Sequence, residues 1–239
     1  MEIGKSEVIV IELRSNSLLA SFPEVHPEAR CKVTFQRTLR VPDDNQEYPL
    51  PAGLGSFPLL PVDDHPVPDH WKQHGGVFLP MYQSEAMWIC FDSWRDSYPF
   101  AVKIAAGKIN AVTGKPWSNE LCSDPQDYVV LPTQPWLDGF HASKDAVRQF
   151  VAMPLGQGFS AEEQITGAAK WGGLQLIFYP MKADEYRKLR QLANSVFCRR
   201  ILDFPHECRS TEMGLAPGGR IKQEIAADKF GAHSGQCCR

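Results

Sequence analysis

The stretch from residue 147 to residue 181 constrains the fold of this 239-residue chain more than any other. It reads VRQFVAMPLGQGFSAEEQITGAAKWGGLQLIFYPM: an apolar run, a glycine loop, a short polar segment, a Gly-Gly turn and a second apolar run. Ser160 followed by Glu163 predicts a helix that starts with a capping box, in which each side chain accepts a hydrogen bond from the other residue's backbone NH. Gly167 predicts the end of that helix, because glycine readily adopts the left-handed conformation of a C-cap. We therefore expect two buried strands joined by a short capped helix to form the structural centre of the protein.

Short apolar or alternating runs elsewhere predict further strands. They lie at residues 7–13, 32–41, 77–82, 100–112, 128–131 and 220–225, and the run at 100–112 should form a hairpin that turns near Gly107 and Lys108. The run AMWICF at 86–91 fits either a strand or a buried helical turn, because periodicity does not separate the two over so short a length. Residues 15–28 are polar and contain proline, which predicts a loop.

Helices are expected to be few. Eight prolines between residues 42 and 80 exclude a long helix there, since proline breaks the helical hydrogen-bond ladder. The longest helical pattern is at 183–197, where apolar side chains recur at Tyr186, Leu189 and Leu192. Many short strands with few helices predict an α+β fold of predominantly antiparallel β-sheets, with few short helices and one longer C-terminal helix. Because no linker or internal repeat is visible, we expect a single globular domain over 1–225, followed by a poorly ordered tail at 226–239.

Composition excludes several classes of partner. A net charge of −3 and an isoelectric point near 6.2 do not fit a nucleic-acid-binding protein. No apolar run approaches the roughly 18 residues of a transmembrane helix, and the first residues do not fit a secretory signal. Seven scattered cysteines without a CxxC pair predict a reduced chain. We therefore expect a cytoplasmic protein with no membrane partner and no cofactor.

Two motif-like groupings are better explained as structure. His70 and His74 are spaced as two ligands on one helical face, but a glycine follows His74 at once, so a helix can hardly span both, and no metal site is expected. Gly156 and Gly158 precede a helix as phosphate-binding glycines do, yet the residues around them match neither phosphate-loop pattern. Two glutamates in the first helical turn would also repel an anion, so this loop is expected to be structural.

Three tryptophans at turns are the most suggestive functional signal. Trp117 follows a proline, Trp136 lies in QPWLDG, and Trp171 precedes Gly172-Gly173. Aromatic rings held on turns can form a stacking floor for a sugar or another flat ligand, although such rings also plug the ends of a β core. Asp138 follows Trp136 by two residues in the sequence. The guanidinium of Arg148 is suited to bind a carboxylate. These five residues form the predicted ligand-binding site.

Several segments of the sequence resemble those of an uncharacterised family of actinobacterial and fungal proteins. They are RTLRVPDD (37–44), YPLPAGLG (48–55), GKINAVTG (107–114), QPWLDG (134–139), RQFVAMPLGQG (148–158) and APGGRIKQE (216–224). The resemblance implies no activity and no catalytic residues. Residues 195–210 and the tail after Ile225 depart from the family pattern.

Three functions remain open from the sequence. The first is a soluble binding or interaction domain with an aromatic-lined site, whose partner is a small molecule, a sugar or another protein. The second is an enzyme of unassigned class, for which Asp138 with His141, or Glu85 with His74, are candidate acid–base pairs. The third is a structural or assembly subunit, which a large exposed apolar face would favour.

Overall fold

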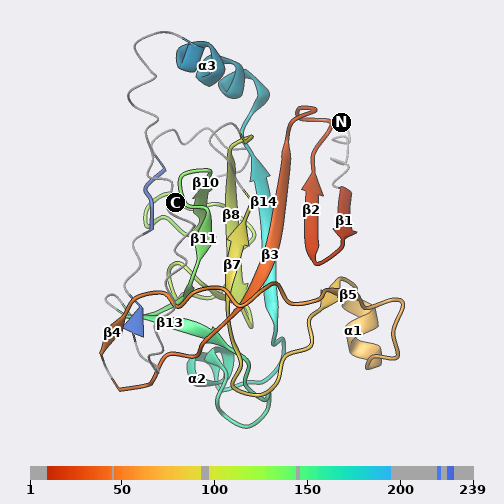
Figure 1. The fold of residues 1–239 in the computed structure, drawn as a ribbon, viewed down its shortest axis with the longest axis vertical. Coiled ribbons are helices and arrows are strands. Elements are labelled where there is room, and N and C mark those ends of the chain that lie inside the picture. Colours follow the sequence, from red (N-terminus) through yellow and green to blue (C-terminus); the bar gives the residue numbers. More distant parts are fainter. Residues whose placement is uncertain are drawn as a thin grey trace, which may run out of the picture.

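A computed structural model describes residues 10–44, 46–92, 97–143, 146–194, 220–221 and 225–228. Within these ranges the protein is built mostly of antiparallel β-sheets, with three helices of which one is longer than two turns (Figure 1). This confirms the predicted α+β class.

The larger sheet has nine strands. Its main path is β1 (Val10–Arg14), β2 (Ser17–Ser21), β3 (Arg30–Thr38), β7 (Ala86–Phe91), β13 (Ala146–Val151), β15 (Arg220–Ile221) and β4 (Glu47–Tyr48). Two more strands join beside this path: β11 (Trp136–Leu137) pairs with β7, and β12 (Gly139–Ser143) pairs with β13. All its strand pairs are antiparallel except β15 with β4.

The smaller sheet and the helices complete the described fold. The second sheet has the order β10 (Val129–Leu131), β8 (Phe100–Ala106), β14 (Leu174–Pro180), with β9 (Ile109–Asn110) beside β8. A separate pair consists of β5 (Leu60–Pro61) and β6 (Val77–Phe78). The helices are α1 (Asp69–His74), α2 (Ala161–Thr166) and α3 (Ala183–Asn194); α2 and α3 lie near opposite ends of β14 (Figure 1).

The main core lies between the two sheets. Alternate residues of β3, Val33 and Phe35, are buried, as are Phe100, Val102 and Ile104 of β8, and all five belong to one hydrophobic cluster. Such alternation is what a strand with one face on a core requires. A smaller cluster covers the outer face of the four-stranded sheet; it contains Ala101, Leu121, Tyr128 and Val130.

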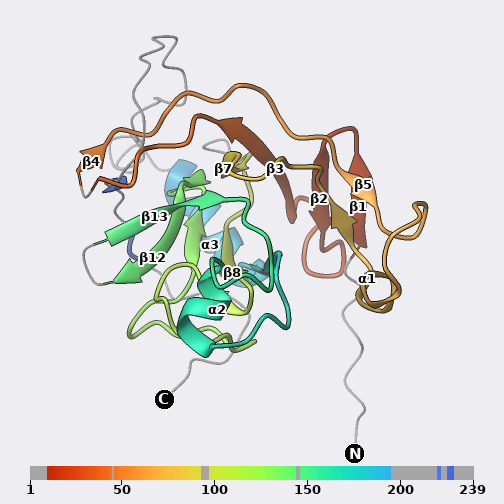
Figure 2. The same cartoon turned by 90° about the horizontal axis from the view of Figure 1, so that it is seen from below.

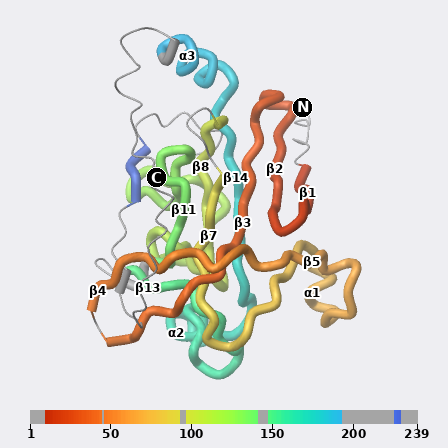
Figure 3. The backbone as a smooth tube through the Cα atoms, in the orientation of Figure 1, coloured from red at the N-terminus to blue at the C-terminus, as the bar shows by residue number. Residues whose placement is uncertain are grey.

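The stretch 147–181 connects the two sheets. Its first strand, β13, belongs to the nine-stranded sheet and its second, β14, to the four-stranded sheet, with α2 between them (Figure 3). The predicted capping box of Ser160 and Glu163 is present, and Gly167 ends the helix with a φ of 73°. The predicted strand–helix–strand order is therefore confirmed. The two strands belong to different sheets, which lie on either side of the main core.

Three local predictions differ from the structure. Residues 17–21, predicted as loop, form β2, because Ser15 adopts a positive φ of 52° and closes a two-residue hairpin turn after β1. The strand predicted at 77–82 is reduced to β6. Residues 86–91, left open between strand and helix, are strand β7, which pairs with β3, β11 and β13.

Some expectations fall outside the described ranges, namely those for residues 7–9, 195–197, 222–224 and 229–239. The boundary at 225/226 stays a prediction, and Ala226 donates its backbone NH to the Gln134 side chain at 2.9 Å. Among the described helices, none is long and apolar enough to cross a bilayer.

Candidate functional site

The turn between β8 and β9 places a lysine where glycine is usual. Gly107 and Lys108 are its two central residues, with φ values of 57° and 61°. Positive φ at both positions is required by the type I′ turn, which matches the twist of a tight hairpin. A lysine in this left-handed region is strained, and such strain is concentrated at functional positions.

Lys108 brings together two of the predicted tryptophans. Its Nζ lies 5.7 Å from the ring centroid of Trp117 and 5.4 Å from that of Trp171. A second ammonium, that of Lys170, lies 5.0 Å from the Trp171 ring, and the His74 ring contacts the same indole edge-on at 5.9 Å. All these separations are within the range of cation–π or ring–ring attraction. We call Lys108, Trp117, Lys170 and Trp171 the Lys–Trp cluster.

Glu162 of α2 shapes the turn that presents Trp171. Its carboxylate is buried and accepts backbone NH groups of Lys170 at 3.0 Å, Trp171 at 2.9 and 3.1 Å, and Gly172 at 2.8 Å. A Cβ at Gly107 would lie 2.7 Å from the Glu162 Cβ, so this glycine is required for space as well as for its φ. One buried carboxylate therefore fixes both the Trp171 turn and its distance from the Lys108 turn.

Gln175 of β14 joins the same two turns. Its Oε1 accepts the backbone NH of Lys108 at 2.8 Å, and its Nε2 donates to the carbonyl of Gly172 at 2.9 Å. The backbone NH of Gly107 also donates to the carbonyl of Gly173 at 2.9 Å. The Lys–Trp cluster thus rests on two turns that are hydrogen-bonded to each other.

A buried ion pair supports the other side of the cluster. Lys103 of β8 is fully buried on the outer face of the four-stranded sheet, and its Nζ donates to Asp127 at 2.6 Å, to Ser118 at 3.1 Å and to the carbonyl of Glu120. The same Nζ lies 5.4 Å from the Trp117 ring centroid. These hydrogen bonds anchor the loop that contains Trp117 to the four-stranded sheet.

The other three predicted site residues lie on the nine-stranded sheet. Trp136, half-buried in β11, pairs with Cys90, and Arg148 of β13 is exposed and forms an ion pair with Asp43 at 3.2 Å. Asp138 is buried where the chain passes from β11 to β12. The structure therefore brings Trp117 and Trp171 together and places Trp136, Asp138 and Arg148 apart from them. Whether any of the five binds a ligand stays a prediction.

Burial changes the acid–base behaviour of Asp138. Desolvation raises its pKa from the ordinary 3.8 to about 7. Register places it next to Trp88 on the outer face of the sheet, because its neighbour Leu137 pairs with Ile89 and both of those side chains are buried in the main core. The Nε1 of Trp88 is buried there without a hydrogen-bond partner in the described part of the chain. The segment between β4 and β5 covers this face (Figure 2), with Gly53 packed close to the Trp88 ring.

Of the two candidate acid–base pairs, the structure describes both side chains of one, Glu85 with His74, and each of these has another partner. Glu85 forms an ion pair with Arg37 at 3.1 Å and accepts the backbone NH of Tyr82. The Nδ1 of His74 is 2.6 Å from the carbonyl of His70, because α1 spans both histidines, contrary to our expectation. The side chain of His141 lies outside the described atoms.

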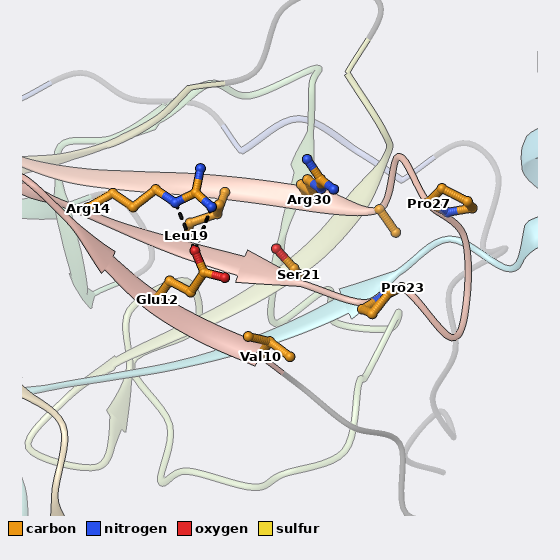
Figure 4. Close-up of a pocket in the computed structure, with 9 residues that line it drawn as sticks. Val10, Glu12, Arg14, Leu19, Ser21, Pro23, Pro27 and Arg30 are labelled. Carbon is orange, nitrogen blue, oxygen red and sulfur yellow. Dashed lines mark hydrogen bonds and ion pairs between the residues drawn. The ribbon is translucent and has the colours of Figure 1, made fainter.

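A hollow of about 180 Å³ lies on the hairpin of β1 and β2 (Figure 4). It contains none of the predicted site residues. The guanidinium of Arg14 and the carboxylate of Glu12, which line it, form an ion pair at 2.6 Å and so satisfy each other.

Sequence reasoning missed four residues of the site: Lys108, Glu162, Lys170 and Gln175. A signal existed for Lys108, because Gly-Lys at a hairpin turn demands a positive φ that lysine rarely adopts. Glu162 was considered as a repulsive charge at a helix start, whereas its carboxylate is turned inward onto backbone NH groups. No local pattern marks Gln175.

The described residues contain no group of three or more His, Cys, Asp or Glu side chains that could hold a metal ion. No family model, no curated protein and no solved structure matches the chain. The resemblance to the actinobacterial and fungal family therefore stays a prediction.

Proposed function

We propose that this protein is a binding domain whose ligand site is the Lys–Trp cluster. The observation that carries the proposal is the shared contact of the Lys108 ammonium with the rings of Trp117 and Trp171. Trp171 is 46% exposed although its turn is held by four hydrogen bonds to a buried carboxylate. A large aromatic surface kept in water by a rigid support is what a stacking site for a flat ligand requires.

A ligand screen tests the proposal. Thermal shift and tryptophan fluorescence are measured with a panel of sugars and small cyclic molecules, because selective binding to the native state raises the melting temperature. We expect at least one class to bind, and Trp171→Ala to abolish that binding. Tyr82→Ala is the matched control, since Tyr82 is 82% exposed and lies outside the cluster. Binding that survives Trp171→Ala, or is lost equally in Tyr82→Ala, would refute the site.

An enzymatic function is the second candidate, and the raised pKa of Asp138 favours it. A carboxyl group with a pKa of about 7 can donate and accept protons near neutral pH. Chromogenic ester, phosphate and glycoside substrates, assayed with the wild type and with Asp138→Asn, test this candidate. Turnover that persists in Asp138→Asn would exclude Asp138 as the acid–base group.

The same proposal includes a cytoplasmic location and the absence of a nucleic-acid partner. The net charge of −3 and the scattered cysteines support it.

A further inference from the structure

Lys108 and Lys170 carry positive charge that no described acidic side chain neutralises. Neither ammonium forms an ion pair or donates a hydrogen bond within the described ranges, whereas Lys103 is paired with Asp127 at 2.6 Å. A lysine ammonium has three donors. Both ammonium groups therefore present unused donors over the Trp171 ring, at 5.4 and 5.0 Å from its centroid.

The carboxylate that packs beneath this turn does not compensate them. Both oxygens of Glu162 accept backbone NH groups of the Trp171 turn, and the side chain is buried. Its charge is thus directed at the backbone, while the two ammonium groups lie on the ring side. The local arrangement separates an inner negative group from outer positive ones.

An aromatic face beside unpaired ammonium groups selects for a ligand with two parts. The part of Trp171 that the lysines leave exposed, with the residue 46% exposed, favours a ring through stacking on the indole. The ammonium groups of Lys108 and Lys170 favour a negative group attached to that ring, through charge-assisted hydrogen bonds. A neutral ring would leave the two charges uncompensated, and an acyclic anion would leave the indole unused.

We infer that the Lys–Trp cluster binds a small ring-bearing carboxylate, with the ring on Trp171 and the carboxylate between Lys108 and Lys170. This inference rests on the proposed function and adds the chemical class of the ligand. Both an acidic sugar and an aromatic acid present this chemistry.

Four probes test the inference by fluorescence titration and calorimetry: glucuronate, benzoate, glucose and acetate. We expect glucuronate or benzoate to bind about tenfold or more tightly than glucose and acetate. Tighter binding of glucuronate would identify the ligand as an acidic sugar, and tighter binding of benzoate would identify it as an aromatic acid. The affinity should fall as salt is raised from about 50 to 500 mM, because Lys170 is exposed and Lys108 half-buried, so salt screens their attraction for an anion.

The matched variants are Lys108→Asn and Lys170→Gln, with Lys182→Gln as control. Asparagine removes the charge of Lys108 but tolerates its positive φ, so the turn is kept. Lys182 is an exposed lysine at the far end of β14. We expect each cluster variant to weaken binding of the ring-bearing acid several-fold and the control to leave it unchanged.

The outcomes separate the two claims. If glucose binds as tightly as glucuronate and Trp171→Ala abolishes both, the ligand class is wrong and the binding site stands. If acetate binds as tightly as the ring-bearing acids, the rings do not contribute and the inference is overturned. If none of the four probes binds while another molecule binds through Trp171, the ligand class is again wrong; if nothing binds through Trp171, both claims fall.

Discussion

The carboxylate of Glu162 accepts the backbone NH of Trp171 with both of its oxygens, at 2.9 and 3.1 Å. The bonds are charge-assisted because their acceptor is a carboxylate, and burial shields them from water. The consequence is a turn whose backbone is fixed from inside the protein while its indole faces outward. The exposed Trp171 is thus positioned by a buried residue.

Glu162→Gln should destabilise the fold. An amide has one acceptor oxygen, so its NH₂ group would face the backbone donors that the second oxygen now satisfies. We expect a loss of about 2–3 kcal/mol in the free energy of unfolding, measured by urea denaturation. Glu163→Gln, at the half-buried capping box next to it, is the control and should cost less. Equal losses would show that Glu162 has no special role in the turn.

Lys103→Met should be more costly than the loss of the whole ion pair. The single change leaves the buried carboxylate of Asp127 without its cation, which typically costs about 3–5 kcal/mol. The double variant Lys103→Met/Asp127→Asn should recover part of this loss, because no uncompensated charge remains. A double-mutant cycle by chemical denaturation measures the difference. Additive losses would contradict a coupled pair.

Asp138 should make the stability depend on pH. Its pKa is about 7 in the folded state and 3.8 ordinarily, so between these values the unfolded chain has lost a proton that the folded protein retains. The free energy of unfolding contributed by this group therefore falls as pH rises from about 4 to 7, and is constant above that range. Asp138→Asn removes this pH-dependent fall. The stability of the variant relative to the wild type should therefore increase as pH rises from about 4 to 7. Thermal melts at intervals of pH check it, with Asp64→Asn as the control for an exposed aspartate. Parallel curves for wild type and Asp138→Asn would disprove the assignment.

Lys108→Asn should separate stability from binding. Asparagine adopts a φ near 61° more easily than lysine, so we expect the free energy of unfolding to rise by up to about 1 kcal/mol. Lys115→Asn, on an exposed lysine without a positive φ, should give no such gain. A stabilised variant with weakened ligand binding would show that the strain at Lys108 serves function. A destabilised variant would mean that its contacts with the two rings outweigh the strain.

Local physics made much of the fold predictable. The hairpin over 100–112, the capping box of Ser160 and the end of α2 at Gly167 all depend on residues within a few positions of each other. The hairpin of β1 and β2 was missed because Ser15 takes a left-handed conformation that serine rarely adopts. Strand pairing was less accessible, since β7 joins segments from widely separated parts of the chain.

The sequence by itself determined the class of the fold, the capped helix and the presence of tryptophans at turns. Tertiary structure alone decided which tryptophans meet: Trp117 and Trp171 come together at Lys108, while Trp136 lies on the other sheet. The physical reason is that caps and turns are satisfied by neighbouring backbone groups. The Lys–Trp cluster depends on bonds between distant parts of the chain, above all that between Gln175 and the backbone NH of Lys108, which become neighbours when β8 and β14 pair.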